Sequence, residues 1–142
     1  MSLVQYIYNT RNRADLTPEK GVLVSMKSVE ICDRLGMTGR VFSTRSHALS
    51  IIEGPTDVMA QYFQAVETQP HIINVLLQGV RDIDTREFGD YSVWLDIDHP
   101  FDSHPKVHAM GPGSLETAMP DKPSARLRIM TDAYFKQGRL VA

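Results

Sequence analysis

The stretch Ala48-Leu49-Ser50-Ile51-Ile52-Glu53-Gly54-Pro55-Thr56-Asp57 decides the fold, because it carries the end of a strand and the start of a helix. Its first six residues are mostly apolar, and two of them are β-branched, which predicts a buried strand. Gly54 and Pro55 break that strand, and Thr56 and Asp57 suit the first turn of a helix. The apolar face of this helix follows at helical spacing, at Met59, Phe63 and Val66.

The sequence before this stretch predicts a strand, a helix and a second strand. Leu3 to Tyr8 is aromatic and β-branched, which predicts a strand, and the polar residues 9–15 predict a loop. Thr17-Pro18-Glu19 is typical of a helix start, and Leu35-Gly36 ends that helix. Its apolar face comprises Val22, Met26, Val29 and Cys32. Arg40 to Ser43 predicts a strand that joins residues 48–53 through a hairpin turn at Thr44 to His47.

Two further strands are predicted after the second helix, at Ile73 to Val80 and Tyr91 to Ile97. The order is therefore β-α-β-β-α-β-β, an α+β fold of the ferredoxin-like type with both helices on one face of the sheet. Right-handed crossovers make the first and third strands neighbours in the centre of the sheet.

We expect three parts along the chain. Residues 1–98 form the domain, residues 99–123 a linker or surface wrap rich in proline and glycine, and residues 124–142 a C-terminal amphipathic helix. The apolar face of that helix comprises Leu127, Met130 and Tyr134. It must be buried either on the open face of the sheet or against a second subunit.

Composition argues against several classes of function. A net charge of −2 and the lack of like-charge blocks argue against nucleic acid and anionic membranes as partners. The single cysteine, Cys32, excludes an internal disulfide, and the N-terminus lacks the pattern of a signal peptide. We therefore expect a cytoplasmic protein. The stretch with Asp96, Asp98, His99, Asp102, His104 and His108 is interpreted as a solvated linker rather than a metal site, because its prolines prevent regular geometry.

Several motifs of the sequence resemble those of the BLUF family of flavin-binding blue-light sensors. The chain from Leu3 to Tyr8 before Leu16-Thr17-Pro18 resembles the start of these domains. Gly36-Met37-Thr38-Gly39 is similar to their G-I-T-G turn, and Ala48 to Gly54 is similar to their F-L-Q-V-L-E-G strand. Arg86-Glu87-Phe88 followed by Tyr91-Ser92-Val93 resembles their R-x-F…W-S-M ending. The resemblance covers Leu3 to about Leu95.

The resemblance implies FAD as cofactor, with its ring between the two helices and the sheet. In the family, a tyrosine of the first strand hydrogen-bonds a glutamine of the third, and that glutamine bonds the flavin. Light rearranges the glutamine, and the change reaches the last strand and the C-terminal helices. Tyr8 matches the tyrosine, but Ser50 stands where the family has the glutamine. Serine has one hydroxyl close to the backbone and no amide, so the family's switch is expected to be absent.

Other family positions differ as well. Ile31 and Cys32 replace the asparagine pair that binds the flavin edge, and Gln64 replaces an arginine of the second helix. In the family's Asp-x-Arg-His signature, Thr68 and Pro70 replace the Asp and Arg, and His71 remains. Tyr91 and Val93 correspond to the Trp and Met of the last strand, whereas Trp94 is out of register with that role.

The sequence therefore predicts a non-enzymatic sensory or interaction domain of this family that lacks its light response and acts through a protein partner or self-association. One alternative keeps FAD with altered photochemistry at Tyr8 or Trp94. Another is a pocket that binds a different small molecule, in the space left by Ser50, Ile31 and Cys32. A small enzyme is the third, but Ser50 lacks a base, because His47 falls on the opposite face of the strand. Cys32 is interpreted as a small buried hydrophobe.

Overall fold

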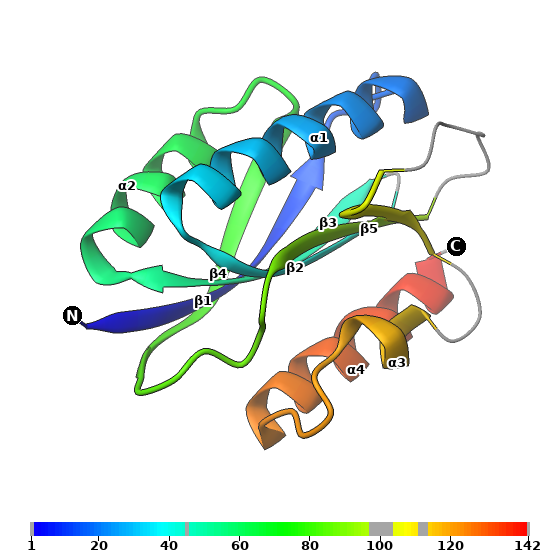
Figure 1. The fold of residues 1–142 in the computed structure, drawn as a ribbon. Helices are drawn as coiled ribbons and strands as arrows, with labels where there is room; N and C mark the ends of the chain where they lie inside the picture. The colour runs from blue at the N-terminus through cyan, green and yellow to red at the C-terminus, as the bar shows by residue number, and fades with distance from the viewer. Residues whose placement is uncertain (1, 45, 97–103, 111–113, 142) are drawn as a thin grey trace.

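The fold is a single sheet with helices on both faces (Figure 1). The computed structural model describes residues 2–44, 46–96, 104–110 and 114–141. The sheet has six strands in the order β4-β1-β3-β2-β5-β6. In chain order the elements are β1 Leu3–Asn12, α1 Pro18–Leu35, β2 Thr38–Ser43, β3 His47–Pro55, α2 Thr56–Glu67, β4 Ile72–Ile83, β5 Tyr91–Leu95, β6 Val107–Ala109, α3 Ser114–Ala118 and α4 Ala125–Val141.

This architecture confirms the predicted α+β, ferredoxin-like fold. Helices α1 and α2 cover one face of the sheet, and β1 and β3 are adjacent, as the crossover rule requires. Strands β1 and β3 pair antiparallel, whereas β2 and β5 run parallel. The polar turn between β2 and β3 closes with a hydrogen bond of 2.8 Å from the Thr44 N–H to the His47 carbonyl.

One prediction about the first strand was wrong. Residues 9–12 belong to β1 rather than to a loop, because β3 and β4 pair with this segment from both sides. Its polar composition is compatible with a strand because the backbone groups are satisfied by the ladder. As a result Thr10 and Asn12 share a face with Tyr8.

Helix α1 begins and ends where the sequence predicts. The Thr17 hydroxyl accepts a hydrogen bond of 3.3 Å from the Lys20 N–H, and Gly36 closes the helix at φ 72°. Gly39, at φ 148°, begins the pairing of β2, where a Cβ atom would overlap the Ile51 carbonyl. Gly36 is therefore required because its backbone is left-handed. Gly39 is required because a side chain there would overlap the Ile51 carbonyl.

Alternation along the strands divides the apolar side chains into two cores. Val4, Tyr8 and Ile52 pack under α1 and α2, whereas Ile7, Leu49 and Ile51 face the opposite side. Helix α4 covers that opposite side with buried Leu127 and Tyr134. Of the two interpretations of the C-terminal helix, the structure therefore shows burial on the open face of the sheet.

The segment between β5 and α4 contributes regular structure that the sequence did not predict. Strand β6 extends the sheet parallel to β5, and α3 packs with α4 on the second core. Ile97, Asp98, His99 and Asp102 lie outside the described residues. Among the residues that are described, no helix has the length and apolar character needed to cross a bilayer.

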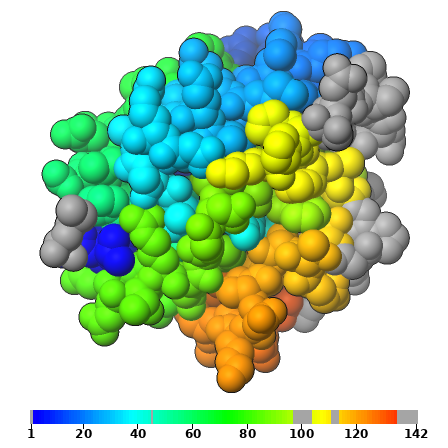
Figure 2. Space-filling view, viewed as in Figure 1, coloured from blue at the N-terminus to red at the C-terminus, as the bar shows by residue number. Residues whose placement is uncertain are grey.

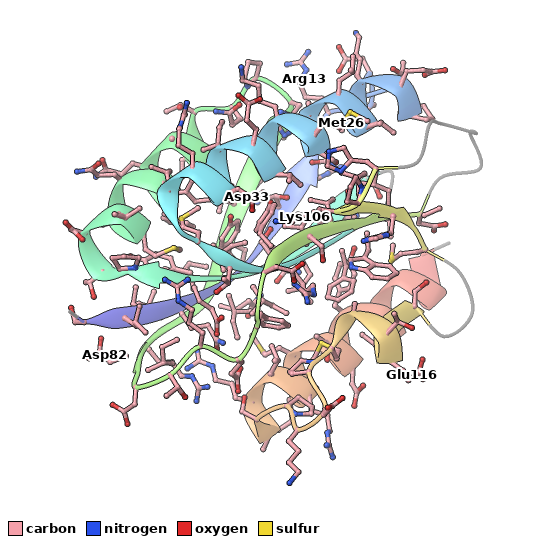
Figure 3. All side chains as sticks on the ribbon, viewed as in Figure 1. Arg13, Met26, Asp33, Asp82, Lys106 and Glu116 are labelled. Atoms are coloured by element: carbon pink, nitrogen blue, oxygen red, sulfur yellow. The ribbon has the colours of Figure 1, made fainter. Side chains whose placement is uncertain are left out.

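The chain around β6 also lies against the outer side of α1, as the adjoining yellow and cyan surfaces in Figure 2 show. The Lys106 ammonium contacts the Asp33 carboxylate of α1 at 2.9 Å, and the two residues lie together in Figure 3. Both side chains are partly exposed, so this pair contributes little stability. The neighbouring Val107 of β6 is buried with the side chains that pack under α1 and α2.

Candidate functional site

A cavity of about 110 Å³ lies between α1, α2 and the sheet. Side chains from β1, β3 and β5 form its floor, and residues of both helices form its walls. Of the residues singled out from the sequence, the cavity brings together Tyr8, Ser50, His71, Tyr91 and Val93. Four of these residues therefore lie on the floor of the cavity, and His71 lies at its edge.

Tyr8 and Ser50 form a direct pair on the floor of the cavity. They are opposite each other in the β1–β3 ladder, and both are at least nine-tenths buried. Burial raises the pKa of the Tyr8 phenol, and the hydrogen bond to Ser50 only partly offsets that shift. Tyr8 therefore stays protonated at any physiological pH, and its hydroxyl interacts with Ser50.

A second hydroxyl cluster joins β5 to the helices. The Tyr91 and Ser28 hydroxyls are 2.5 Å apart, and Tyr62 of α2 also lines this region. Cys32 is fully buried beside them, and burial raises the pKa of its thiol to about 11. The neutral thiol fits the interpretation of Cys32 as a small buried group and gives no thiolate for redox chemistry.

The remaining part of the cavity is lined by Thr10, Asn12 and His71. Thr10 and Asn12 are 6% and 7% exposed. Neither side chain makes a hydrogen bond within the part of the chain that the structure describes, but the buried unpaired side-chain atoms found there are Gln5 Oε1 and Arg81 Nε rather than atoms of these two residues. His71 is half-buried, and burial lowers its imidazole pKa, so the ring is neutral at pH 7.

Four positions singled out for flavin contact do not line the cavity, namely Ile31, Cys32, Gln64 and Thr68. Gln64 and Thr68 are exposed, and the Thr68 hydroxyl donates to the Ala65 carbonyl at 2.9 Å. Trp94 packs with the second core, on the opposite face of the sheet. Its indole N–H donates to Ser92 at 3.1 Å, and its ring stacks on His108.

Sequence reasoning missed Ser28, Tyr62, Thr10 and Asn12. Ser25, Ser28 and Cys32 fall on one face of α1, and small polar residues on a buried helix face are a usable indication of a cavity. Thr10 and Asn12 were missed because their segment was assigned to a loop. Tyr62 was missed because the predicted face of α2 was defined by its neighbour Phe63, which packs on Tyr6 and Tyr8.

A buried carboxylate on the α4 side of the sheet was also not singled out. Glu53 is fully buried and accepts hydrogen bonds from Gln5, Thr38 and the N–H groups of Glu87 and Phe88, at 2.8–3.1 Å. Glu87 in turn accepts from the N–H of Ser124, directly before α4, at 3.2 Å. These contacts fasten the β4–β5 loop and the start of α4 to the centre of the sheet.

Comparison with known proteins agrees with the fold and the motifs. The model of the family described as "BLUF: Sensors of blue-light using FAD" matches residues 3–94, and no curated protein matches. The dark-state structure of the BLUF protein BlrB is 26% identical, with a TM-score of 0.59, over 66% of this chain and 71% of that one. The photo-activated state of BlsA is 13% identical, with a TM-score of 0.62, over 68% and 71%.

One further structural match extends beyond residues 3–94, which the family model covers. Klebsiella pneumoniae BlrP1, solved with FMN and cyclic diGMP, is 15% identical with a TM-score of 0.75. That match covers 96% of this chain but only 35% of BlrP1, so the likeness of fold includes the C-terminal helices. The family match, the order of the motifs and the sheet topology agree, and the chain belongs to the BLUF family of sensory domains.

Proposed function

We propose that this chain is a sensory or interaction domain of the BLUF family in which the flavin-dependent hydrogen-bond switch has been lost. The observation that carries the proposal is the direct Tyr8–Ser50 pair. A serine hydroxyl lies one carbon from the backbone, and here it already interacts with the tyrosine. It has no amide that could exchange a donor for an acceptor, so light has no side chain to rearrange.

The residues of this site do not fit a flavin. Pockets for cofactor-sized ligands have volumes of roughly 300–1,000 Å³, whereas this cavity measures about 110 Å³. Cys32 lies within the tyrosine cluster and offers a weak thiol donor where the family has an amide. A buried flavin edge without partners would cost about 1–3 kcal/mol for each unpaired group.

The test is an absorption spectrum of the full chain purified with excess FAD, before and after blue light, beside a Ser50→Gln variant. We expect the wild type to show no reversible red shift of flavin absorption. A wild-type protein that retains FAD and shifts reversibly under blue light would contradict the proposal. A shift confined to the Ser50→Gln variant would support it, because a single side chain would then account for the lost switch.

The alternative that keeps FAD with altered photochemistry now depends on Tyr8 alone. Tyr8 lines the cavity, whereas Trp94 is separated from it by the sheet. A flavin held in this site would therefore draw its electron from Tyr8, and Tyr8→Phe would prolong flavin fluorescence. An unchanged fluorescence lifetime in that variant would exclude this alternative.

We infer that the expected self-association uses the edge strand β4, because α4 covers the open face of the sheet. Four apolar side chains of β4 are exposed, those of Ile73, Leu76, Leu77 and Val80. No charged residue of β4 falls between Ile72 and Val80, so the strand itself places no charge against edge pairing there. The cytoplasmic location expected from composition stays a prediction.

Light scattering during size-exclusion chromatography tests this inference. Leu76→Lys should shift the protein towards the monomer, since charges block edge pairing. Leu23→Lys is the matched control, because Leu23 is 66% exposed on α1. A monomeric wild type at high concentration, or equal effects of the two variants, would refute the role of β4.

A further inference from the structure

Two buried side-chain atoms on the α4 face of the sheet, Gln5 Oε1 and Arg81 Nε, have no hydrogen-bond partner among the described residues. Gln5 is only 1% exposed. The Arg81 side chain is 34% exposed, but its Nε atom is buried. Because buried polar atoms in folded proteins are nearly always hydrogen-bonded, either to protein or to ordered water, this acceptor and this donor both need a partner.

The two atoms belong to a polar row that crosses four strands. Gln5 of β1 lies opposite Arg81 of β4 on one side and opposite Glu53 of β3 on the other. Thr38 of β2 lies opposite Glu53 and donates to it at 2.9 Å. Directly opposite residues of an antiparallel ladder point to the same face, with Cβ atoms about 4.5–5.5 Å apart. The space between the Gln5 and Arg81 side chains is therefore confined.

Two carboxylates fix the orientation of the Gln5 amide. Its Nε2 donates to Glu53 at 3.1 Å and to Glu87 at 2.9 Å. A reversed amide would place its carbonyl oxygen against the same two carboxylates, which have no hydrogen to donate. Oε1 is therefore the atom of Gln5 that needs a donor, whereas Arg81 Nε is a donor that needs an acceptor.

The chemistry of these two atoms determines what can bind between them. The bound group must donate to Gln5 Oε1 and accept from Arg81 Nε. An anion cannot donate to the carbonyl oxygen, and a metal ion or an ammonium group cannot accept from the N–H. A hydroxyl group does both. Of the molecules that carry one, only water is small enough for the space between two paired strands, and two polar partners are enough to hold a buried water.

We propose that a buried water molecule bridges Gln5 Oε1 and Arg81 Nε and completes the polar row beneath the start of α4. The row reaches α4 through Glu87, which accepts from Gln5 and from the N–H of Ser124. The water thus connects the edge strand β4 to the strands and the loop that hold α4. Its site lies on the opposite face of the sheet from the cavity, so the inference is independent of the proposed function.

Water-selective NMR spectra of the full, isotope-labelled chain test the proposal. A long-lived bound water gives cross-peaks of opposite sign in NOESY and ROESY spectra, whereas hydrogen exchange gives the same sign in both. We expect cross-peaks of opposite sign from water to the Arg81 Nε–H and to the Gln5 side-chain amide. The side-chain amide of Gln78 is the matched control, because it donates to Asn9 at 3.0 Å in an exposed position, and it should show no such pair.

Two variants remove the partners of the water in turn. Arg81→Lys keeps a positive charge near Glu87 but has no Nε–H, so the water signal at Gln5 should fall about twofold or more. Gln5→Met keeps the length of the side chain but has no carbonyl, so the signal at Arg81 should disappear. Because Gln5→Met also removes a donor to the buried Glu53, Arg81→Lys carries the test if that variant does not fold.

Three results would overturn the inference. The first is a wild type without cross-peaks of opposite sign at either group, since the two atoms would then pair directly. The second is an Arg81→Lys variant with an unchanged water signal at Gln5. The third is an equal signal at Gln78, because the water at Gln5 would then be ordinary surface hydration.

Discussion

Ser50 is the side chain on which the proposed loss of the family's light switch depends. Its place opposite Tyr8 in the β1–β3 ladder was predictable from the motif, because strand alternation fixes the face of every residue. Its interaction with the Tyr8 phenol was not predictable, since that contact depends on the approach of the two strands. The position of Ser50 could therefore be predicted from the sequence, whereas its contact with Tyr8 could be found only in the structure.

Cys32 gives a prediction at the same scale. Burial raises the pKa of its thiol to about 11, so the thiolate is scarce at pH 8 and the sulfur is inaccessible. We expect alkylation by iodoacetamide in the native protein to be at least about a hundredfold slower than in the urea-unfolded chain. Comparable rates in the two states would show that the α1 side of the core opens readily.

Glu53 gives a second prediction for a single residue. Glu53→Gln replaces one carboxylate oxygen by an NH2 group that faces N–H or O–H donors, so at least one buried donor loses its acceptor. We expect a loss of about 2–4 kcal/mol in the free energy of unfolding, measured by urea titration. Glu116→Gln, in α3, is the control and should change stability little. A Glu53→Gln variant as stable as wild type would show that the loop is fastened by other contacts.

At the scale of elements, α4 was predictable and its docking was not. Leu127, Met130 and Tyr134 marked its apolar face, but burial on the sheet or on a second subunit satisfies that pattern equally. The structure distinguishes them through Tyr134, whose hydroxyl donates to the Phe42 carbonyl at 3.0 Å and lies 3.2 Å from that of His47. The short elements β6 and α3 had no usable signal, because few residues carry too little periodicity.

Tyr134→Phe tests this docking. The change removes the hydroxyl but keeps the ring, so we expect a loss of about 1–2 kcal/mol in the free energy of unfolding. The measurement is chemical unfolding followed by circular dichroism. Hydrogen exchange should show faster opening of α4 while β1 and β3 keep their protection. An equal loss of protection throughout would mean that α4 and the sheet unfold as one unit.

For the molecule as a whole, the buried phenols and thiol predict a loss of stability at alkaline pH. Burial raises the pKa of Cys32 to about 11 and of Tyr134 to about 12, above their ordinary values of 9.0 and 10.0. Above those ordinary values the unfolded chain ionises first, so the folded state loses stability as the pH rises from 9 to 12. Urea midpoints measured across this range should fall steadily, and a flat profile would contradict the burial of these groups.

The place of β1 between two other strands has a consequence for synthesis in the cell. Strand β1 lies between β3 and β4 and is synthesised before both, since β3 begins only at His47 and β4 at Ile72. At elongation rates of roughly 5–20 residues per second, Leu3–Asn12 remains without either partner for seconds. Nascent chains stalled before Ile72 should therefore engage chaperones through this apolar segment, and release them once β4 has emerged.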